Sequence, residues 1–152
     1  TFTTVSGQPC SIEWTGKVGG FDFSVSDGSI NVTEWASVNG AYWAKNESII
    51  NWNSADGSLY ISMDLYHTSD ANKFIPDGTY EVKDFNNSAT NYIVKECEVT
   101  YNGVRGKMMS GWLKTEQISG GYNLEFEIVD ANGVTYTGTY SGAIGGNATN
   151  PA

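Results

Sequence analysis

Residues 121–141 read GYNLEFEIVDANGVTYTGTYS, and this stretch decides the fold. Apolar and polar residues alternate on both sides of Asn132-Gly133. Alternation with a period of two predicts strands that bury one face and expose the other to solvent. An Asn-Gly pair is the favoured two-residue turn of a β-hairpin. The stretch therefore predicts two antiparallel strands, 121–129 and 134–141.

The same alternation and the same kind of turn recur along the rest of the chain. Inward-facing positions expected in the core are Leu59, Ile61, Met63, Leu65, Leu124, Phe126 and Ile128. Further turn pairs are Asp27-Gly28, Asn39-Gly40, Asp56-Gly57, Asp77-Gly78 and Asn102-Gly103. Between them, strands are expected over 11–18, 21–26, 30–38, 48–53, 58–66, 79–84, 91–101 and 104–114. Helix signals are almost absent, and a short turn or loop is expected at 68–74.

Many short strands in a chain of 152 residues predict a single all-β domain. The architecture is an antiparallel β-sandwich, of jelly-roll or immunoglobulin-like type, or a closed β-barrel. The pattern does not choose between these two. We expect the domain to cover 1–144, with 145–152 as a flexible tail or the start of a linker.

The charge balance excludes two classes of partner. The net charge is −9, and only 16% of the residues are charged. Nucleic acids and anionic membranes are bound by clustered Lys and Arg, which this chain lacks. No apolar run is long enough to cross a membrane, so we expect no membrane insertion of this segment. The surface is expected to be neutral and polar.

Two segments carry a resemblance to known proteins. One is 75–80, Ile-Pro-Asp-Gly-Thr-Tyr, and the other runs from Gly121 through Asp130 to Gly142. In this order they resemble small all-β domains of secreted or lipid-anchored surface proteins from gut bacteria of the Bacteroidetes type. The resemblance implies a secreted, periplasmic or cell-surface setting, and some such domains occur near glycan-uptake systems. It transfers no catalytic residue.

Aromatic residues beside amides suggest a carbohydrate site. Sugars present apolar C–H faces to aromatic rings and hydroxyls to amides and carboxylates. This combination occurs twice in a short stretch. The candidate ligand-binding residues are Tyr42, Trp43, Asn51, Trp52, Asn53 and Asp56. The leading hypothesis is therefore a non-catalytic domain that recognises a glycan at the cell surface.

Two other functions fit the same pattern. A lipocalin-like barrel would hold a small apolar ligand inside its strands. A structural or adhesive domain of a larger surface protein would bind a protein partner, for which exposed Tyr60 and Tyr66 are suitable.

Catalysis is not expected. Glycoside hydrolysis needs two carboxylates on opposite sides of a cleft, and same-strand pairs such as Glu125 with Glu127 lack that geometry. Two acids from different strands that face each other across a groove beside Trp43 or Trp52, one of them desolvated, would change this view. His67 is the single histidine, and we interpret it as an exposed loop residue.

No cofactor or metal ligand set is indicated. A structural calcium ion held by scattered oxygens would leave no sequence pattern. Cys10 and Cys97 are the two cysteines. They either form a disulfide, which suits an oxidising compartment, or are two buried thiols.

Overall fold

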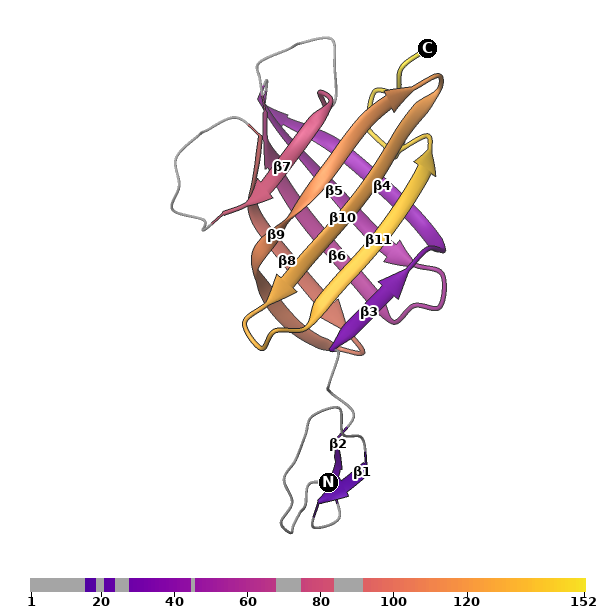
Figure 1. Cartoon of the computed structure of the whole chain (residues 1–152). Coiled ribbons are helices and arrows are strands. Elements are labelled where there is room, and N and C mark those ends of the chain that lie inside the picture. Colours follow the sequence, from indigo (N-terminus) through magenta and orange to yellow (C-terminus); the bar gives the residue numbers. More distant parts are fainter. Residues whose placement is uncertain (1–15, 19–20, 24–27, 45, 68–74, 84–91) are drawn as a thin grey trace.

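The computed structural model describes residues 16–18, 21–23, 28–44, 46–67, 75–83 and 92–152, and these ranges contain strands and no helix (Figure 1). The strands are β1 (Gly16–Val18), β2 (Phe21–Phe23), β3 (Ser29–Val32), β4 (Trp35–Ala44), β5 (Glu47–Ser54), β6 (Leu59–Tyr66), β7 (Gly78–Val82), β8 (Ile93–Tyr101), β9 (Val104–Ile118), β10 (Gly121–Asp130), β11 (Thr135–Gly142) and β12 (Gly145–Gly146). The all-β prediction is confirmed. The turn expected at 68–74 lies outside the described residues.

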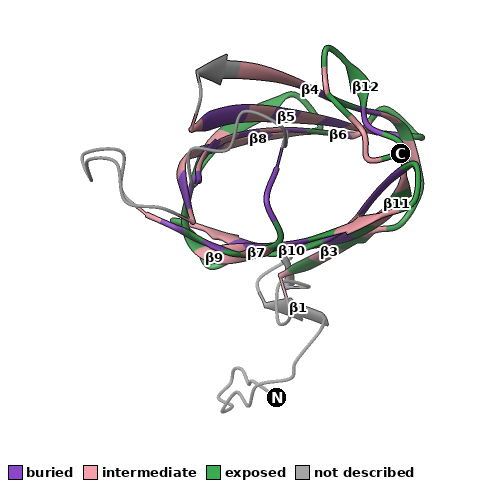
Figure 2. Ribbon diagram, turned by 90° about the horizontal axis from the view of Figure 1, so that it is seen from above, coloured by how far each residue is buried: buried purple, intermediate pink, exposed green. Residues whose placement is uncertain are grey.

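One sheet surrounds the core. β1 and β2 pair with each other, and the other strands form a sheet in the order β12-β4-β5-β6-β8-β7-β9-β10-β11-β3. Most neighbours are antiparallel, but β7–β8, β11–β3 and β12–β4 are parallel pairs. β3 and β4 stand near opposite ends of this order, yet only Thr33 and Glu34 separate them in the chain. The sheet therefore curls until its edges meet, which gives a barrel-like domain (Figure 2).

The inward faces of the alternating strands make the core. All the residues that alternation predicted to be buried are buried, namely Leu59, Ile61, Met63, Leu65, Leu124, Phe126 and Ile128. Each such side chain contributes roughly 1.5–3 kcal/mol when it leaves water. Gly138 faces Phe126 across β10 and β11. A Cβ at Gly138 would lie 2.6 Å from the Phe126 ring and 2.8 Å from Trp35, so glycine makes room for both rings.

Aromatic rings fill part of the interior. The ring centroid of Trp52 lies 5.0 Å from that of Trp35 and 4.9 Å from that of Phe126, both in tilted or edge-on arrangements. Such contacts between rings add to the stabilisation that comes from buried area. Tyr101 and Tyr136 make a similar contact at 6.2 Å. This part of the barrel is therefore packed with side chains.

The turn predictions hold at three pairs and fail at two, and Asp27 of the sixth pair lies outside the described residues. Asp77-Gly78 is one of the failures, because Gly78 begins β7 and has no positive φ. Gly57, Gly133 and the pair Asn102-Gly103 adopt positive φ in tight turns, as expected for these residues. Asn39-Gly40, in contrast, lies inside β4, so this turn prediction was wrong. Val38 and Gly40 continue the inward-facing alternation, and their pairing with β5 carries the strand through the glycine.

The last residues are bound to the body of the domain, although 145–152 was expected as a flexible end. β12 pairs with β4, and Ile144 is buried. The side chain of Asn150 bonds both the N–H and the carbonyl of Ile144, at 2.8 and 2.9 Å. Tyr122 Oη donates to the Thr149 carbonyl at 2.8 Å. Side-chain bonds to the backbone hold this segment, and composition alone does not reveal them.

Candidate functional site

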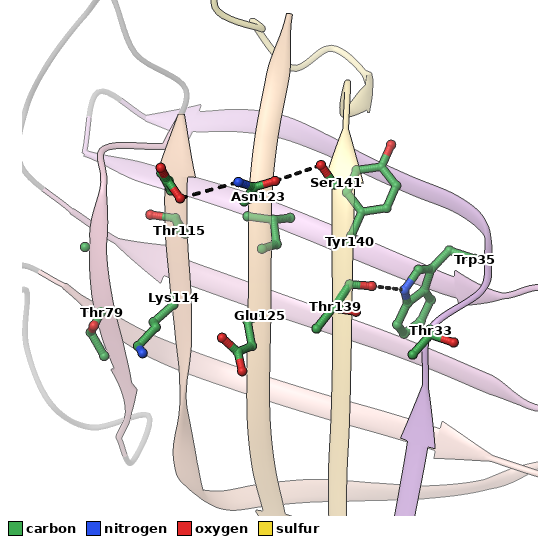
Figure 3. A pocket seen from close by; sticks show the side chains of 13 residues that line it. Thr33, Trp35, Thr79, Lys114, Thr115, Asn123, Glu125, Thr139, Tyr140 and Ser141 are labelled. Atoms are coloured by element: carbon green, nitrogen blue, oxygen red, sulfur yellow. Dashed lines mark hydrogen bonds between the residues drawn. The ribbon is translucent and has the colours of Figure 1, made fainter. Parts of the chain in front are cut away.

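A broad groove lies on the outer face of β7, β9, β10 and β11. The antiparallel register places Thr79 opposite Lys114, Lys114 opposite Glu125, and Glu125 opposite Thr139. Alternation turns the side chains of these four residues outward, while their chain neighbours fill the core. Figure 3 shows them side by side across the four strands. We call these four residues the groove row.

Two aromatic residues bound the groove at the β11 side. The groove has a volume of about 750 Å³, and Trp35 and Tyr140 line it together with the groove row (Figure 3). The Trp35 indole N–H donates to the Thr139 carbonyl at 2.7 Å. The Tyr140 hydroxyl donates to the Ala143 carbonyl. Both rings are therefore held in fixed positions beside the polar floor.

Beside the groove row, a second row is bonded internally. Asn123 Nδ2 donates to Glu116 Oε1 at 3.4 Å, and Ser141 Oγ donates to Asn123 Oδ1 at 2.7 Å.

The groove row lacks such bonds. Within the described part of the chain, the side chains of Thr79, Glu125 and Thr139 have no hydrogen-bond partner, and Lys114 and Glu125 form no ion pair. The groove row therefore offers donors and acceptors that water alone satisfies.

A tryptophan lies on the same outer face, next to the groove. Trp112 is half-buried and sits in register between Glu81 on β7 and Glu127 on β10. The Lys114 ammonium lies over its ring, 5.4 Å from the centroid. This is a cation–π contact between two residues on the same face of one strand.

The structure separates the residues predicted to bind a ligand. Trp52 is fully buried, whereas Asn51 and Asn53 lie on the outer face of β5. Neighbouring residues of a strand point to opposite faces, so these three cannot form one surface. Both amides also have partners already. Tyr60 Oη donates to Asn51 Oδ1 at 3.1 Å, and Asn53 Nδ2 donates to Ser37 Oγ at 3.2 Å.

The remaining predicted residues are also dispersed. Tyr42 is half-buried and packs against the core. Trp43 belongs to β4, and its side chain lies outside the described residues.

Asp56 organises the β5–β6 turn. Its carboxylate accepts bonds from Ser58 N at 2.9 Å, Ser58 Oγ at 2.7 Å and Ser54 Oγ at 2.8 Å. These bonds, with the Ser58 backbone first, lower the pKa of Asp56. Its carboxylate is thus engaged within the turn, although it borders a small pocket of about 190 Å³.

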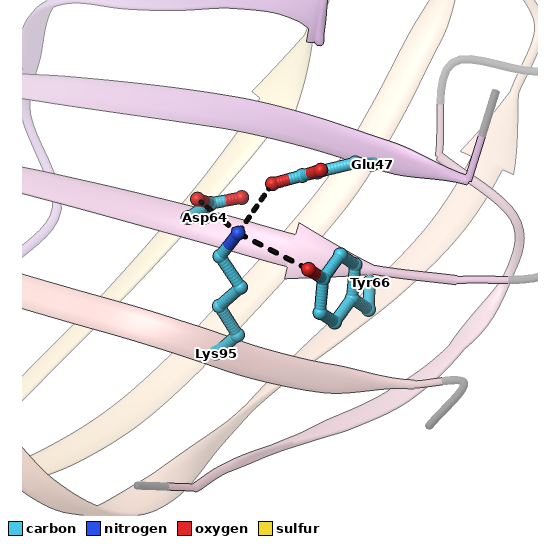
Figure 4. Close-up of polar contacts among 4 residues, drawn as sticks. All are labelled: Glu47, Asp64, Tyr66 and Lys95. Carbon is cyan, nitrogen blue, oxygen red and sulfur yellow. Dashed lines mark hydrogen bonds and ion pairs between the residues drawn. The ribbon is translucent and has the colours of Figure 1, made fainter. Parts of the chain in front are cut away.

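A charged cluster occupies the outer face of β5, β6 and β8 (Figure 4). Lys95 Nζ lies 2.6 Å from Glu47 Oε1, 3.4 Å from Asp64 Oδ2 and 3.2 Å from Tyr66 Oη. It also lies over the Tyr66 ring, 4.6 Å from the centroid. Tyr66, which we expected to be exposed, is therefore half-buried under the lysine.

The acids of this cluster share one lysine. Burial, and then the charge of Glu47, raises the pKa of Asp64 to about 6. Burial lowers the pKa of Lys95, but hydrogen bonds to Glu47 and Tyr66 outweigh that effect and raise it overall. Glu47 and Asp64 are thus two acids from different strands, one of them desolvated. The ammonium group bonds to both, and neither the groove nor the small pocket includes them.

The interpretation of His67 as an exposed loop residue was wrong. Its side chain is fully buried, and Nε2 lies 2.8 Å from Ser48 Oγ. His67 directly follows β6, and its N–H bonds the Asn46 carbonyl, so the chain is still held against the sheet there.

Cys97 is buried as a free thiol, and burial raises the pKa of that thiol. Cys10 lies outside the described residues. In the described ranges, no group of three or more His, Cys, Asp or Glu side chains is placed to hold a metal ion. The same ranges contain no helix long and apolar enough to cross a membrane.

The sequence contained a signal for the groove that tryptophan spacing did not reveal. The solvent-exposed face of the 121–141 hairpin contributes Asn123, Glu125, Thr139 and Ser141 to the groove. In the alternating pattern of the hairpin, these positions fall on the face opposite the core. Thr79 and Lys114 lie side by side only because β7 pairs with β9. The local sequence pattern does not predict which strands pair.

Comparisons with models of protein families, with curated proteins and with solved structures found no match. The function is therefore argued from the groove itself.

Proposed function

We propose that the chain is a non-catalytic, carbohydrate-binding domain of a secreted or cell-surface protein, and that the groove on β7, β9, β10 and β11 is its site. The observation that carries the proposal is the groove row, whose exposed polar side chains lie in an open groove next to fixed aromatic rings. The cell-surface setting rests on the sequence resemblance.

The chemistry of the groove suits sugars. Hydroxyls of Thr79 and Thr139, the Glu125 carboxylate and the Lys114 ammonium together offer both donors and acceptors to sugar hydroxyls. Tyr140 and Trp35 are half-buried against the core, and the exposed parts of their rings offer apolar surface to C–H groups at one side of the groove. A groove on the outer face of the sheet, rather than an enclosed cavity, suits an extended chain better than a small enclosed ligand.

The carboxylates of the groove support binding rather than hydrolysis. Glu116 and Glu125 are both exposed on neighbouring strands. A glycosidase needs one carboxyl group desolvated so that it stays protonated as the general acid. Asp64 is desolvated, but it lies in the Lys95 cluster and outside the groove.

A protein partner is the second candidate. Val104 and Met109 on β9 are 73% and 59% exposed, and Tyr60 is 40% exposed. Exposed apolar side chains of this size are common at protein interfaces. The lipocalin-like alternative has less support, because the Trp35, Trp52 and Phe126 rings fill part of the interior.

The test is a titration of soluble polysaccharides, followed by intrinsic tryptophan fluorescence and by affinity gel electrophoresis. Trp35 lines the groove and Trp112 lies beside it, so occupancy is expected to change the emission. The variant Glu125→Ala is expected to lose tenfold or more in affinity, since a bond to a charged group is worth about 1.5–3 kcal/mol.

The matched control is Glu96→Ala, on β8 outside the groove. It is expected to bind as the parent does. Failure of every polysaccharide in the panel to bind would contradict the proposal, and so would equal losses in the two variants.

A further inference from the structure

Given a glycan-binding groove, as proposed above, we infer that it takes an uncharged, linear polysaccharide laid across the strands, and that it rejects acidic polysaccharides. The proposal concerns the class of ligand and the direction in which it lies. It rests on the spacing of the groove row and on the charges around it.

The groove row runs perpendicular to the strands. Its four residues stand on the neighbouring strands β7, β9, β10 and β11, in direct register. Adjacent strands are about 4.8 Å apart, so the row spans roughly 14 Å from Thr79 to Thr139. One strand spacing is comparable to the length of a pyranose ring. A linear chain across the strands therefore presents one ring after another to successive polar side chains.

The second row supports the same direction. Glu116, Asn123 and Ser141 lie opposite one another on β9, β10 and β11, in a row parallel to the groove row. Their polar groups bond one another, so the unbonded groups of the groove row are the ones left for a chain that runs across the strands.

The charge around the groove is negative. Glu116 and Glu125 line it, and Glu127 lies in register in the row of Trp112. Glu81, at the other end of that row, is paired with Lys83 at 3.2 Å and adds no uncompensated charge. Across these three rows, Lys114 is the one cationic side chain. Its ammonium is also placed over the Trp112 ring and close to the Glu125 strand. A uronate or sulfate group in the groove would therefore meet more carboxylates than cations.

The repulsion of acidic chains by the groove carboxylates adds to the repulsion that comes from the net charge of −9 of the whole chain. Surface charges are screened by salt beyond about 8 Å at physiological ionic strength. Binding of a neutral chain is thus expected to change little with salt. Whatever weak binding an acidic chain shows is expected to rise with salt, which is the opposite of an ordinary ion-pair interaction.

The experiment compares polymers that share a backbone and differ in charge. Affinity electrophoresis and calorimetry are run with hydroxyethylcellulose against carboxymethylcellulose, and with fully methyl-esterified polygalacturonate against polygalacturonate, at 20 and 300 mM salt (about fifteenfold apart). For each pair in which the neutral polymer binds, it is expected to bind at least tenfold tighter than the acidic one at low salt. Oligosaccharides of the binding polymer are expected to gain affinity up to about four rings, which match the four strands of the groove row.

The double variant Glu116→Gln/Glu125→Gln tests the cause of the rejection. It is expected to reduce the preference for neutral over acidic polymer severalfold, because it removes two carboxylates from the groove. Glu96→Gln on β8 is the charge-matched control, and it is expected to keep the preference. A far-ultraviolet circular dichroism spectrum and a melting temperature equal to those of the parent report the folding of both variants.

The outcomes separate the two proposals. Equal or tighter binding of acidic polymers, or an affinity that stops rising at a single ring, would overturn this inference and leave the glycan-binding function standing. No binding by any neutral or acidic polymer would overturn both.

Discussion

On the outer face of β5, β6 and β8, Glu47, Asp64 and Tyr66 all turn towards Lys95. On the outer face of β7, β9, β10 and β11, the side chains of the groove row stand in line without bonding one another. The two faces belong to one sheet and use the same kinds of residue. Polar side chains that bond one another stabilise the fold, whereas polar side chains that do not bond one another are available to a ligand.

Removing the lysine at the centre of the cluster is expected to have the largest effect. Lys95→Met leaves two partly buried carboxylates without their cation, and we expect a loss of about 3–5 kcal/mol in the free energy of unfolding. Urea denaturation at pH 7 measures it. Lys114→Met on the groove face is the matched control, with an expected change within about 0.5 kcal/mol. Similar losses in both variants would erase the distinction between the two faces.

Titration of Asp64 is expected to have the next largest effect. Its pKa is about 6 in the folded protein and 3.8 as a model value. Because the folded state holds the proton more tightly, the stability from this group is fully present below pH 4 and is lost as the pH rises through 6. The shift corresponds to about 2–3 kcal/mol.

Asp64→Asn removes this titration. The difference in unfolding free energy between parent and variant is expected to change between pH 4 and pH 6.5 and to be constant above that range. Urea denaturation across this pH range, in a single buffer system, measures the difference. A difference that does not vary with pH would show that Asp64 is not desolvated.

The tryptophans of the groove face allow a sharper comparison. Trp35→Phe removes the indole bond to the Thr139 carbonyl and some core contact with Trp52, with an expected loss of about 1–2 kcal/mol. Trp112→Phe loses only a cation–π contact at the surface, worth about 0.5 kcal/mol. Thermal unfolding followed by far-ultraviolet circular dichroism ranks the two. The reverse order would mean that Trp112, and not Trp35, is the structural residue.

The smallest expected effect is on binding alone. Thr139→Ala removes one hydroxyl from the groove row, and we expect a threefold to tenfold loss of polysaccharide affinity, or about 0.5–1.5 kcal/mol. Thr100→Ala on β8 is the matched control on the other face. Both variants are expected to have the same melting temperature as the parent. Equal affinity for both would place the site elsewhere.

Sequence pattern was sufficient for the core and for most of the strands. The single strand expected over 30–38 was wrong, because the chain is divided there at Thr33 and Glu34 into β3 and β4. The alternation along 59–65 and 122–128 identified buried residues correctly, because a strand face is decided by local order. The same rule should have separated Trp52 from Asn51 and Asn53, which are its immediate neighbours. Neighbours in a strand point to opposite faces, so residues adjacent in sequence do not share one surface.

The groove could not be predicted in the same way. It needs residues near 79, 114, 125 and 139 to meet in register, and strand pairing between distant segments leaves no local pattern. The burial of His67 also depends on long-range structure. Its partner Ser48 faces the interior from β5, and only the pairing of β5 with β6 brings them together.

The closure of the barrel by β3 has a consequence for the rate of folding. The bond from Trp35 to Thr139 joins residues 104 positions apart, and that from Thr137 to Asn31 spans 106. Contacts this distant in sequence must wait until a long loop has closed, which makes folding slow compared with that of proteins rich in local contacts. Until β11 is in place, β3 has no strand partner among the described residues. An acidic surface would help the unfinished chain stay apart from its neighbours during this delay.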